Sequence, residues 1–553
     1  MNTTLARLSR RILPAVLGVT VIAGCGGSGG SPVAKGTPPS AAPASPATAA
    51  SASAPPSPSA SPTPTPKPTG DADPALKPFY GQQIAWSSCP DDPAQKNVDM
   101  SAFQCGTAHV PLDYTNPGAD TIDLALMRKQ AIHQDQRLGS LFLNPGGPGG
   151  SGLDLLTNAA TSSFGNLNNR YDLIGFDPRG VGKSTAVHCL DDTARDQLDA
   201  QDHAGPTSVK DLGAACEAKS GKLLPFVGTV NAARDLDVLR GAVGDQKLNY
   251  LGFSYGTSLG TYYANQFPDR TGRLVLDGAM DPSVSNLDSS VAQMVGFESV
   301  FEHFAADCVN QSGCPLGSDP NTAAKKAADF LDGLQAHPLT SATSGRTLTQ
   351  ALGWTGTMDM LYGDAKSWGY LRIGLSNAMK AHSPDALIAF ADDYNSRDQQ
   401  GHYSNQADAN QAINCADDGS TPPTDDQLQQ ALQQLHTKAP YLTNHMTVDD
   451  VRASMDCADW PVHGPTPPQV LKATGSAPIL VVGSTGDDAT PYAWAQHLAS
   501  SLANATLLTR DGDGHTGYDK SSCIKSDVDA FLIDGTMPAA GTHCATNPPT
   551  SSS

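Results

Sequence analysis

The segment KLNYLGFSYGTSLGTYYANQFPDR, residues 247–270, decides the fold. It contains the pattern Gly-x-Ser-x-Gly around Ser254. The pattern alone carries little weight, because glycine fills 53 of the 553 positions and the same pattern recurs at 26–30 in a stretch with no strand or helix signal. The surroundings are more informative, since a strand-like run (248–253) precedes the serine and a helix-like run (258–265) follows it. A serine in a sharp strand-to-helix turn is typical of a catalytic nucleophile, which is what we predict here.

The same succession of an apolar run and a glycine-rich or proline-containing turn recurs along the chain. It appears in SLFLNPGGPGGSG (140–152), YDLIGFDPRGVGKS (171–184) and RLVLDGAMDP (273–282). TIDLALMR (121–128) alternates like a half-buried strand, and helix-like stretches such as NAARDLDVLRGAV (231–243) lie between the strand-like runs. Strands that alternate with helices predict an α/β fold with a mostly parallel sheet, whose chemistry lies at the carboxyl ends of the strands.

This pattern changes after about residue 285. Apolar residues recur at helical spacing in VAQMVGFESVFEHFAADCVNQ (291–311), and strand-like runs return only at APILVVGSTGDDATP (477–491) and ATLLTRDGDGH (505–515). A mostly helical insertion therefore interrupts the α/β core. The predicted units are a core formed by residues 76–285 and 460–545, a helical cap at 286–459, and a disordered tail at 546–553.

The first 75 residues predict export and tethering. Three arginines among the first eleven residues precede an apolar run (12–21) that is too short to span a membrane. The following Ile-Ala-Gly-Cys tetrapeptide (22–25) is similar to a bacterial lipobox, so residues 1–25 are predicted to be a lipoprotein signal peptide with Cys25 as the acylated residue. Residues 26–75 are rich in Pro, Ala, Ser and Thr, and we expect a disordered linker that lifts an extracytoplasmic protein off the membrane. An ordinary secretory peptide is the alternative.

Charge and cysteine content limit the partners. The net charge of −20 argues against nucleic acid as a partner. Ten cysteines remain besides Cys25, an even number that indicates disulfides in an exported chain. Many pairings are possible, and a metal site is the alternative, but the sequence has no CxxC pair and no His-x3-His motif beside one. Pairs in chain order would be Cys89–Cys105, Cys189–Cys216, Cys308–Cys314, Cys415–Cys457 and Cys523–Cys544.

A serine hydroxyl needs a general base, and His515 is our candidate. It lies in the glycine-rich loop RDGDGHTGY after a strand-like run (506–509), beyond the insertion where the core resumes. His497 falls in a helix-like stretch and His543 lies near the end of the chain, so both fit surface histidines better. We therefore predict that His515 accepts the proton of Ser254.

The acid that orients the histidine is predicted to be Asp487. In α/β-hydrolases the catalytic residues follow the chain order serine, acid, histidine. Asp487 comes just after the strand-like run 479–482, which places it at a carboxyl end. Asp488 is adjacent, and Asp277 also ends a strand-like run, so both stay open as alternatives.

An oxyanion formed on attack needs backbone N–H donors. One is expected to be Tyr255, directly after the nucleophile. The other is expected from the loop NPGGPGG (144–150), where Gly147 is preferred and Gly146 is possible because the two prolines of the loop have no N–H. A purely structural Gly-Pro turn is the alternative.

The stretch DPRGVGKS (177–184) ends like a phosphate-binding loop. That pattern requires glycine where Asp177 stands, and an exported protein meets little ATP. We interpret the stretch as a structural loop near the active site and expect no cofactor and no metal.

Together these stretches resemble the tripeptidyl aminopeptidase-type serine hydrolases, which are exported bacterial α/β-hydrolases related to proline iminopeptidases. The resemblance spans nearly all of residues 80–545. One departure is Asp488, where a proline is expected after the catalytic aspartate. The matching stretches are CGTAHVPLDYTNP, LFLNPGGPGGSG, YDLIGFDPRGVGKS, NYLGFSYGTSLG, LDGAMDP, INCADD, CADWP, GDDATPYAWA and GHTGY.

The resemblance implies cleavage of short peptides, tripeptides among them, from a free N-terminus through an acyl-enzyme, with the helical insertion as a lid over the cleft. An aminopeptidase needs a carboxylate for the substrate ammonium group, and four acidic residues of the insertion are candidates. A solvated surface carboxylate is the alternative for each. The four candidates are Asp417, Asp418, Glu298 and Glu302.

The sequence thus predicts a monomeric, membrane-anchored or shed serine exopeptidase whose partner is a peptide with a free N-terminus. An esterase or amidase acting on a small secreted metabolite is the nearest alternative, because the same triad would serve it. A non-catalytic surface-binding lipoprotein is a third hypothesis, which the presence of all three triad residues in order disfavours.

Overall fold

The structure is a computed structural model of the 553-residue chain. It describes residues 70–91, 98–160, 162–201, 206–419, 421–453, 457, 460–462 and 469–547. The predicted signal peptide with Cys25, the linker up to residue 69 and the tail after residue 547 lie outside the described residues. No helix among the residues that are described is both long and apolar enough to cross a membrane.

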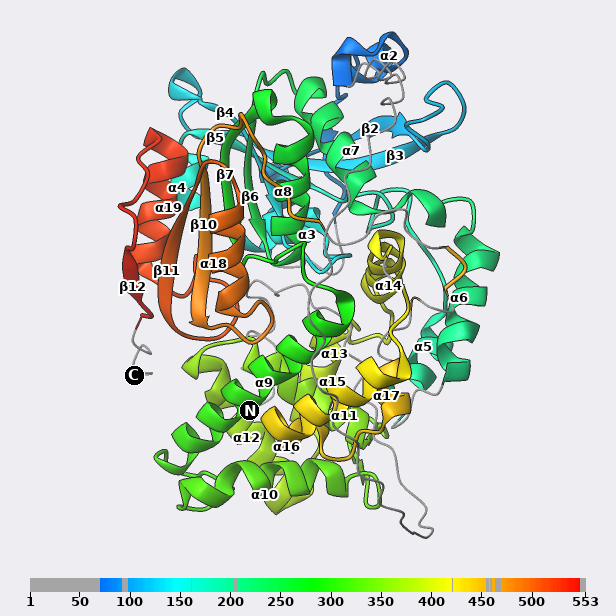
Figure 1. The fold of residues 1–553 in the computed structure, drawn as a ribbon, viewed down its shortest axis with the longest axis vertical. Coiled ribbons are helices and arrows are strands. Elements are labelled where there is room, and N and C mark those ends of the chain that lie inside the picture. Colours follow the sequence, from blue (N-terminus) through cyan, green and yellow to red (C-terminus); the bar gives the residue numbers. More distant parts are fainter. Residues whose placement is uncertain are drawn as a thin grey trace, which may run out of the picture.

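A ten-stranded sheet forms the centre of the core (Figure 1). The strands lie in the order β1-β2-β3-β5-β4-β6-β7-β10-β11-β12. The pairings from β1 to β5 are antiparallel, and all pairings from β5 to β12 are parallel, so the predicted mostly parallel sheet is confirmed. The strands are Ser87–Ser88 (β1), Gln104–Pro111 (β2), Thr121–Lys129 (β3), Gly139–Asn144 (β4), Tyr171–Phe176 (β5), Leu248–Phe253 (β6), Thr271–Asp277 (β7), Ile479–Gly486 (β10), Ala505–Asp513 (β11) and His543–Ala545 (β12).

Helices cover both faces of this sheet, and that is why its inner strands read as continuous apolar runs. Every residue of β4 and of β5 is buried, whereas β3, nearer the edge, alternates between exposed and buried positions in its first half. The helices of the core are Lys77–Tyr80 (α2), Gly152–Ala159 (α3), Gly165–Asn168 (α4), Asp192–Asp199 (α5), Pro206–Ser220 (α6), Thr229–Ala242 (α7), Tyr255–Gln266 (α8), Tyr492–Ser501 (α18) and Ser522–Asp534 (α19).

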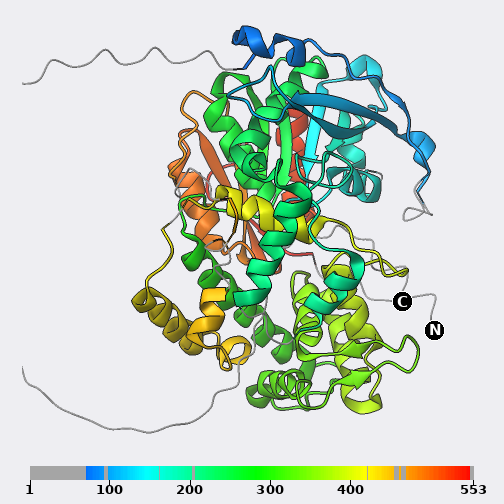
Figure 2. The ribbon, with the colours of Figure 1, turned by 90° about the vertical axis from the view of Figure 1, so that its right-hand side faces the viewer.

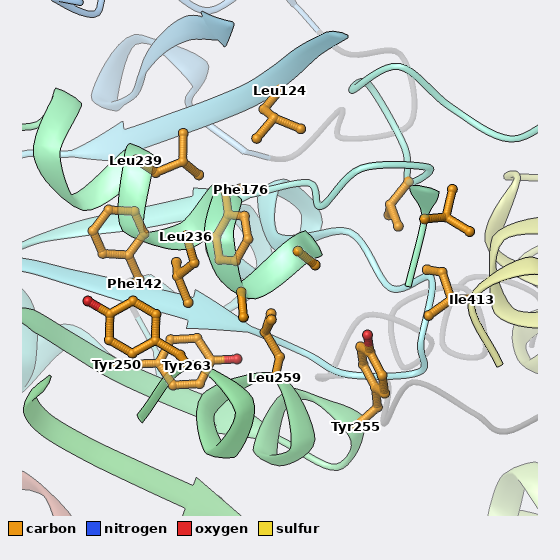
Figure 3. Packing of buried hydrophobic residues seen from close by; sticks show 14 of the residues in the cluster. Leu124, Phe142, Phe176, Leu236, Leu239, Tyr250, Tyr255, Leu259, Tyr263 and Ile413 are labelled. Carbon is orange, nitrogen blue, oxygen red and sulfur yellow. The ribbon is translucent and has the colours of Figure 1, made fainter. Parts of the chain in front are cut away.

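Successive side chains of β4 point to opposite faces of the sheet and join two different apolar clusters. Phe142 packs in the cluster formed with Leu236 of α7 and Leu259 of α8, which Figure 3 shows from close by. Leu141 and Leu143 belong to the cluster that α3 and α19 cover. Each of these side chains is fully buried, and such burial stabilises the fold by roughly 1.5–3 kcal/mol per side chain.

The residues between β7 and β10 form a mostly helical cap, which lies below the sheet in Figures 1 and 2. Most of the cap helices share an apolar cluster of their own, centred on residues such as Phe301 and Trp354. α9 passes so close to the loop after β10 that a Cβ at Gly296 would lie 2.5 Å from the Asp488 carbonyl oxygen. The cap elements are Asn286–Val309 (α9), Pro320–Gly333 (α10), Leu339–Thr340 (β8), Thr347–Leu348 (β9), Gln350–Leu361 (α11), Ala365–Ala381 (α12), Asp385–Tyr394 (α13), Gln406–Asp417 (α14), Asp425–Lys438 (α15), Pro440–Thr443 (α16) and Val448–Ala453 (α17).

The ten cysteines of the folded part are joined in the five chain-order pairs. The sulfur–sulfur separations lie between 1.84 and 2.12 Å. The five bonds are Cys89–Cys105, Cys189–Cys216, Cys308–Cys314, Cys415–Cys457 and Cys523–Cys544.

A close contact between two glycines seats α3, the helix that follows the Gly-Pro loop, against β5. A Cβ at Gly152 would lie 2.2 Å from the Phe176 carbonyl oxygen, and one at Gly175 would lie 2.2 Å from the Gly152 carbonyl oxygen. The Phe176 carbonyl belongs to β5 and cannot move away without disturbing the sheet. We expect Gly152→Ala to lower the free energy of unfolding by about 1–3 kcal/mol, measured by urea denaturation.

Gly165→Ala in α4 is the matched control for that substitution. A Cβ there would have no neighbour within 4 Å, and alanine favours helix over glycine. The control should be neutral or slightly stabilising. Equal unfolding midpoints for Gly152→Ala and the wild type would contradict the predicted clash.

Candidate active site

Ser254 lies between β6 and α8 in a conformation that side chains rarely adopt. Its φ is 55° and its ψ is −126°. Hydrogen bonds on both sides hold it there: its N–H donates to the Asp277 carbonyl (2.9 Å), and its own carbonyl accepts the N–H (2.8 Å) and hydroxyl (2.6 Å) of Thr257. Such a strained non-glycine residue at a strand-to-helix turn is the geometry of a nucleophile elbow.

The elbow packs directly on the end of β4. A Cβ at Gly256 would lie 2.7 Å from the Asn144 side-chain oxygen, so the small residue after the turn is needed for this contact. Helix α8 begins at Tyr255, three residues before the helix-like run predicted from the sequence. The first N–H groups of α8, including that of Tyr255, therefore lie beside Ser254. Because they are at the helix N-terminus, they have no hydrogen-bond acceptor within the helix.

His515 and Asp487 form a buried pair. The His515 Nδ1 atom lies 2.8 Å from one Asp487 carboxylate oxygen and 3.1 Å from the other. The backbone N–H groups of Thr490 (2.7 Å) and Thr516 (3.1 Å) also donate to this carboxylate. Burial alone would raise the pKa of Asp487, but the nearby His515 and these hydrogen bonds outweigh it and hold the pKa below its usual value, so the group is a carboxylate.

The imidazole lies at the end of β7, whose last residue also bonds the nucleophile. A Cβ at Gly278 would lie 2.9 Å from the His515 Cε1 atom, and the preceding residue, Asp277, accepts the Ser254 N–H. The Ser254 Oγ and His515 Nε2 atoms are both buried, and neither has a hydrogen-bond partner among the described residues. These are the two atoms that a serine nucleophile and its general base would join.

Two loops bring backbone donors to Ser254. A Cβ at Gly146 would lie 2.9 Å from both the Ser254 Cβ and the Tyr255 nitrogen, so the Gly-Pro loop touches the elbow. The Gly146 N–H itself donates to the Asn144 side chain (3.0 Å). This bond favours the next amide, that of Gly147, as the second oxyanion donor beside Tyr255.

The two alternative acids have other contacts. The Asp277 carboxylate accepts the backbone N–H groups of Gly517 and Tyr518, each at 2.8 Å, and burial raises its pKa to about 6. Asp488 accepts the Ala489 N–H with one oxygen (3.1 Å), and its other oxygen is buried without a partner among the described residues. Of the three acids, Asp487 is the one whose carboxylate hydrogen-bonds the His515 ring.

The two histidines set aside from sequence are surface residues. His497 pairs with Asp281, and its side chain is about half exposed. His543, on the outermost strand β12, pairs with Asp511 of β11 at 2.9 Å, and both side chains are about half exposed. Both therefore lie apart from the buried elbow.

Asp417 and Asp418, two of the four ammonium-binding candidates, lie at the end of α14. The Asp417 carboxylate accepts the Thr229 N–H (2.7 Å) and the Thr229 hydroxyl, which in turn bonds the Tyr255 hydroxyl. Burial raises the pKa of Asp417 to about 7. Asp417 thus connects the cap to the residue after the nucleophile, and Asp418 is the half-buried residue that follows the helix.

Glu298 and Glu302, the other two candidates, lie on α9. The two oxygens of the Glu298 carboxylate accept the N–H groups of Tyr441 (2.9 Å) and Leu442 (3.0 Å) at the start of α16. Burial raises its pKa to about 7. Glu302 is exposed. The carboxylates of Asp417 and Glu298 thus already accept hydrogen bonds from the protein itself.

Sequence reasoning missed three residues that contact His515. The Thr490 hydroxyl lies 3.2 Å from Nδ1, and the Tyr362 ring packs edge-on against the imidazole with 5.7 Å between centroids. The Tyr362 carbonyl accepts the His515 N–H (3.0 Å), and Lys520 donates to the carbonyls of both residues. Thr490 was detectable in principle, being three residues after Asp487, but no spacing points to Tyr362 in the cap.

The DPRGVGKS stretch holds the loop before α3. The Asp177 carboxylate accepts the Ser151 hydroxyl (2.6 Å) and the Lys183 N–H (2.8 Å). Because Ser151 caps α3, this contact fixes the start of the helix that follows the Gly-Pro loop. A cavity of about 530 Å³ lies elsewhere, at the amino ends of the strands beside Asn249 and Arg273, and none of the predicted site residues lines it.

Comparisons with known proteins identify relatives that cover most of the chain. Residues 444–544 match a family model described as "TAP-like protein". Serine protease Hip1 of Mycobacterium tuberculosis is 37% identical over 85% of this chain and 92% of its own length, and Carboxylesterase B of the same species is 37% identical over 85% and 91%. Tripeptidyl aminopeptidase of Streptomyces lividans is 32% identical over 84% of this chain and 86% of its own length.

Removal of the Asp487 charge tests the predicted triad. Asn can no longer fix the histidine tautomer or stabilise an imidazolium, so we expect Asp487→Asn to lower kcat on the order of 10⁴-fold while the urea unfolding midpoint changes little. The rate of p-nitrophenyl acetate hydrolysis measures this effect.

Asp511→Asn, which alters the exposed pair with His543, is the control and should leave the rate unchanged. Near-normal turnover in Asp487→Asn would assign the acid to Asp277 or Asp488 instead.

Proposed function

The chain belongs to the family of tripeptidyl aminopeptidase-like serine hydrolases, and on that premise we propose that it is an exported serine aminopeptidase that releases short peptides, tripeptides among them, from free N-termini. The observation that carries the proposal is the buried His515–Asp487 pair beside Ser254, with the Ser254 Oγ and His515 Nε2 atoms left free for each other and for a substrate. No step requires a cofactor.

Acylation begins when the Ser254 Oγ attacks the carbonyl carbon of the scissile peptide bond. His515 takes the hydroxyl proton at Nε2, and Asp487 holds the ring tautomer through Nδ1 and stabilises the imidazolium. The carbonyl oxygen becomes an oxyanion, and the amides of Tyr255 and Gly147 donate to it. Losing one such donor typically costs 10²–10³-fold in kcat. His515 then gives its proton to the leaving amine, and the C–N bond breaks.

Deacylation repeats these steps with water as the nucleophile. His515 accepts a proton from water, the hydroxide attacks the ester carbon, and the Ser254 oxygen leaves as it regains the proton. The product is a short peptide with a new carboxylate. The burial of Ser254 and His515 supports this chemistry, because a dry site strengthens the electrostatic contacts with the oxyanion.

An esterase is the second candidate, because the relative named Carboxylesterase B is 37% identical to this chain, the same value as Serine protease Hip1. The triad serves both reactions, so it does not decide between them. A peptide is the substrate we propose, because two relatives are named as a protease and a tripeptidyl aminopeptidase.

Matched peptides with free and acetylated N-termini test the peptidase. We expect the wild type to release di- or tripeptides only from the free form, because the acetyl group removes the charge on which an aminopeptidase relies. Mass spectrometry of the products also gives the step size. Ser254→Ala is the control and should release nothing. Cleavage of simple esters without cleavage of any peptide would favour the esterase.

Lipid anchoring is proposed from the sequence alone, through the lipobox at residues 22–25. Mass spectrometry of the mature N-terminus should find a diacylglycerol on Cys25, and Cys25→Ala should move the protein from the membrane to the soluble fraction. An unmodified N-terminus produced at another cleavage site would refute the anchor.

A further inference from the structure

Helix α14 follows the other cap helices in the chain but packs with the core. Its buried residues, Ala409 and Ile413 among them, join the apolar cluster of α7 and α8 and not the cluster that most cap helices share. Figure 3 shows Ile413 on the same side of this cluster as Tyr255, the residue after the nucleophile. The apolar packing therefore places α14 against the segment that carries Ser254.

Both ends of α14 are attached to other segments. At its start, the Asn405 side chain accepts the Gly182 N–H (2.8 Å) and donates to the Gly180 carbonyl (2.8 Å). Near its end, a disulfide joins Cys415 to Cys457. With its ends attached and one face buried, the helix can act as a fixed support for the groups that it touches.

The first contact of α14 with the site is made through the Gly-Pro loop. The Asn410 side chain donates to the Pro148 carbonyl (3.0 Å), and the Asn414 side chain donates to the Asn410 side-chain oxygen (3.0 Å), which fixes how the Asn410 amide is turned. Asn410 is 5% exposed. The loop also packs against the helix backbone, because a Cβ at Gly149 would lie 2.5 Å from the Gln406 carbonyl oxygen.

The Gly-Pro loop needs such outside contacts to keep one conformation. Four of the seven residues in NPGGPGG are glycines, and glycine has many accessible backbone conformations. Inside the loop, the Gly150 N–H donates to the Gly146 carbonyl (3.1 Å), which closes a turn around Gly147. That bond does not fix where the turn lies relative to Ser254. The contact with α14 supplies this constraint.

The second contact runs from the end of α14 to the first residue of α8. The Asp417 carboxylate accepts the N–H (2.7 Å) and the hydroxyl of Thr229, and the Thr229 hydroxyl bonds the Tyr255 hydroxyl. Thr229 is 1% exposed, and a Cβ at Gly228 would lie 2.7 Å from a carboxylate oxygen of Asp417, so these groups are closely packed. A Tyr255 side chain held in this way restricts the backbone amide of the same residue.

From these contacts we propose that α14 positions both donors of the oxyanion hole. Asn410 acts through the Gly-Pro loop on the Gly147 amide, and Asp417 acts through Thr229 on the Tyr255 amide. Both are positioning residues, because each acts through a donor and not on the substrate. Placement matters because such donors work at about 2.7–3.1 Å from the oxyanion. The proposal rests on the oxyanion donors of the proposed function and deepens it, whether the substrate is a peptide or an ester.

A trifluoromethyl ketone measures the oxyanion hole directly. The Ser254 Oγ adds to its carbonyl carbon, the hydroxyl proton passes to His515, and the ketone oxygen becomes the oxyanion that the two amides bind. Such a mimic of the transition state depends on the donors, whereas the matching methyl ketone forms far less of the adduct and reports ground-state binding. Phenethyl trifluoromethyl ketone and phenethyl methyl ketone are compared as inhibitors of p-nitrophenyl acetate hydrolysis by the full chain.

Three variants break the two contacts. Asn410→Ala removes the donor to the Pro148 carbonyl, Asp417→Ala removes the acceptor of Thr229, and Tyr255→Phe removes one hydroxyl but keeps the Tyr255 amide. Each should weaken inhibition by the trifluoromethyl ketone by about 10- to 100-fold and lower kcat/KM for the ester by a similar factor. Inhibition by the methyl ketone should stay unchanged. A smaller folded fraction would lower the rate without changing either inhibition constant, so the two ketones separate positioning from folding.

Ala407→Gln, at an exposed position of α14, is the matched control and should keep the wild-type ratio of the two inhibition constants. That ratio in Asn410→Ala, or in both Asp417→Ala and Tyr255→Phe, would overturn the proposal. An equal loss of affinity for both ketones would also overturn it. If the ratio falls in the variants but the wild type cuts esters and no peptide, the positioning role stands and only the aminopeptidase function fails.

Discussion

The site depends on Asp277, the last residue of β7. Its carbonyl accepts the Ser254 N–H, and its carboxylate accepts two successive N–H groups just after His515. One residue at the end of one strand therefore positions both the nucleophile and its base. The carboxyl group is fully buried, and the two amide donors partly offset the cost of burying it. Asp277 was an alternative for the catalytic acid, and these contacts favour a positioning role for it instead.

The cap is part of the site as well as a cover over it. The Tyr362 carbonyl in the cap accepts the His515 N–H, and Asp417 in α14 reaches Tyr255 through Thr229. The catalytic loop and the elbow are thus each bonded to a different cap segment. A cap that moved as one rigid lid would break both contacts. Motions that admit substrate should therefore involve parts of the cap outside these two attachments.

The arrangement of the core could be predicted because it follows local patterns. Apolar runs that end in glycine-rich or proline-containing turns predicted β4 to β7. Two further apolar runs after the helical insertion predicted β10 and β11. Boundaries were less accurate: β10 runs to Gly486, four residues past the predicted end, because pairing with β11 continues through a shift in register. The strand propensities of residues 479–486 do not indicate how far this segment pairs with its neighbour.

The parts of the site that sequence could not supply depend on contacts between distant segments. Glu298 looked like a binding residue until its partners, more than 140 positions away, proved to be amides of α16. Tyr362 precedes His515 by more than 150 residues, and only the folded cap brings their rings together. The residue types thus predicted which chemical groups the reaction needs. They did not show which carboxylates are already bonded to other parts of the protein.

The burial of the nucleophile limits which molecules can inhibit the enzyme. Ser254 is 1% exposed and His515 is fully buried. A folded protease inhibitor presents a rigid loop with two strands of chain, and the burial of Ser254 disfavours so bulky a ligand. A single chain end is the thinnest form that a polypeptide can offer. The same geometry spares the surface loops of folded proteins, including the enzyme's own.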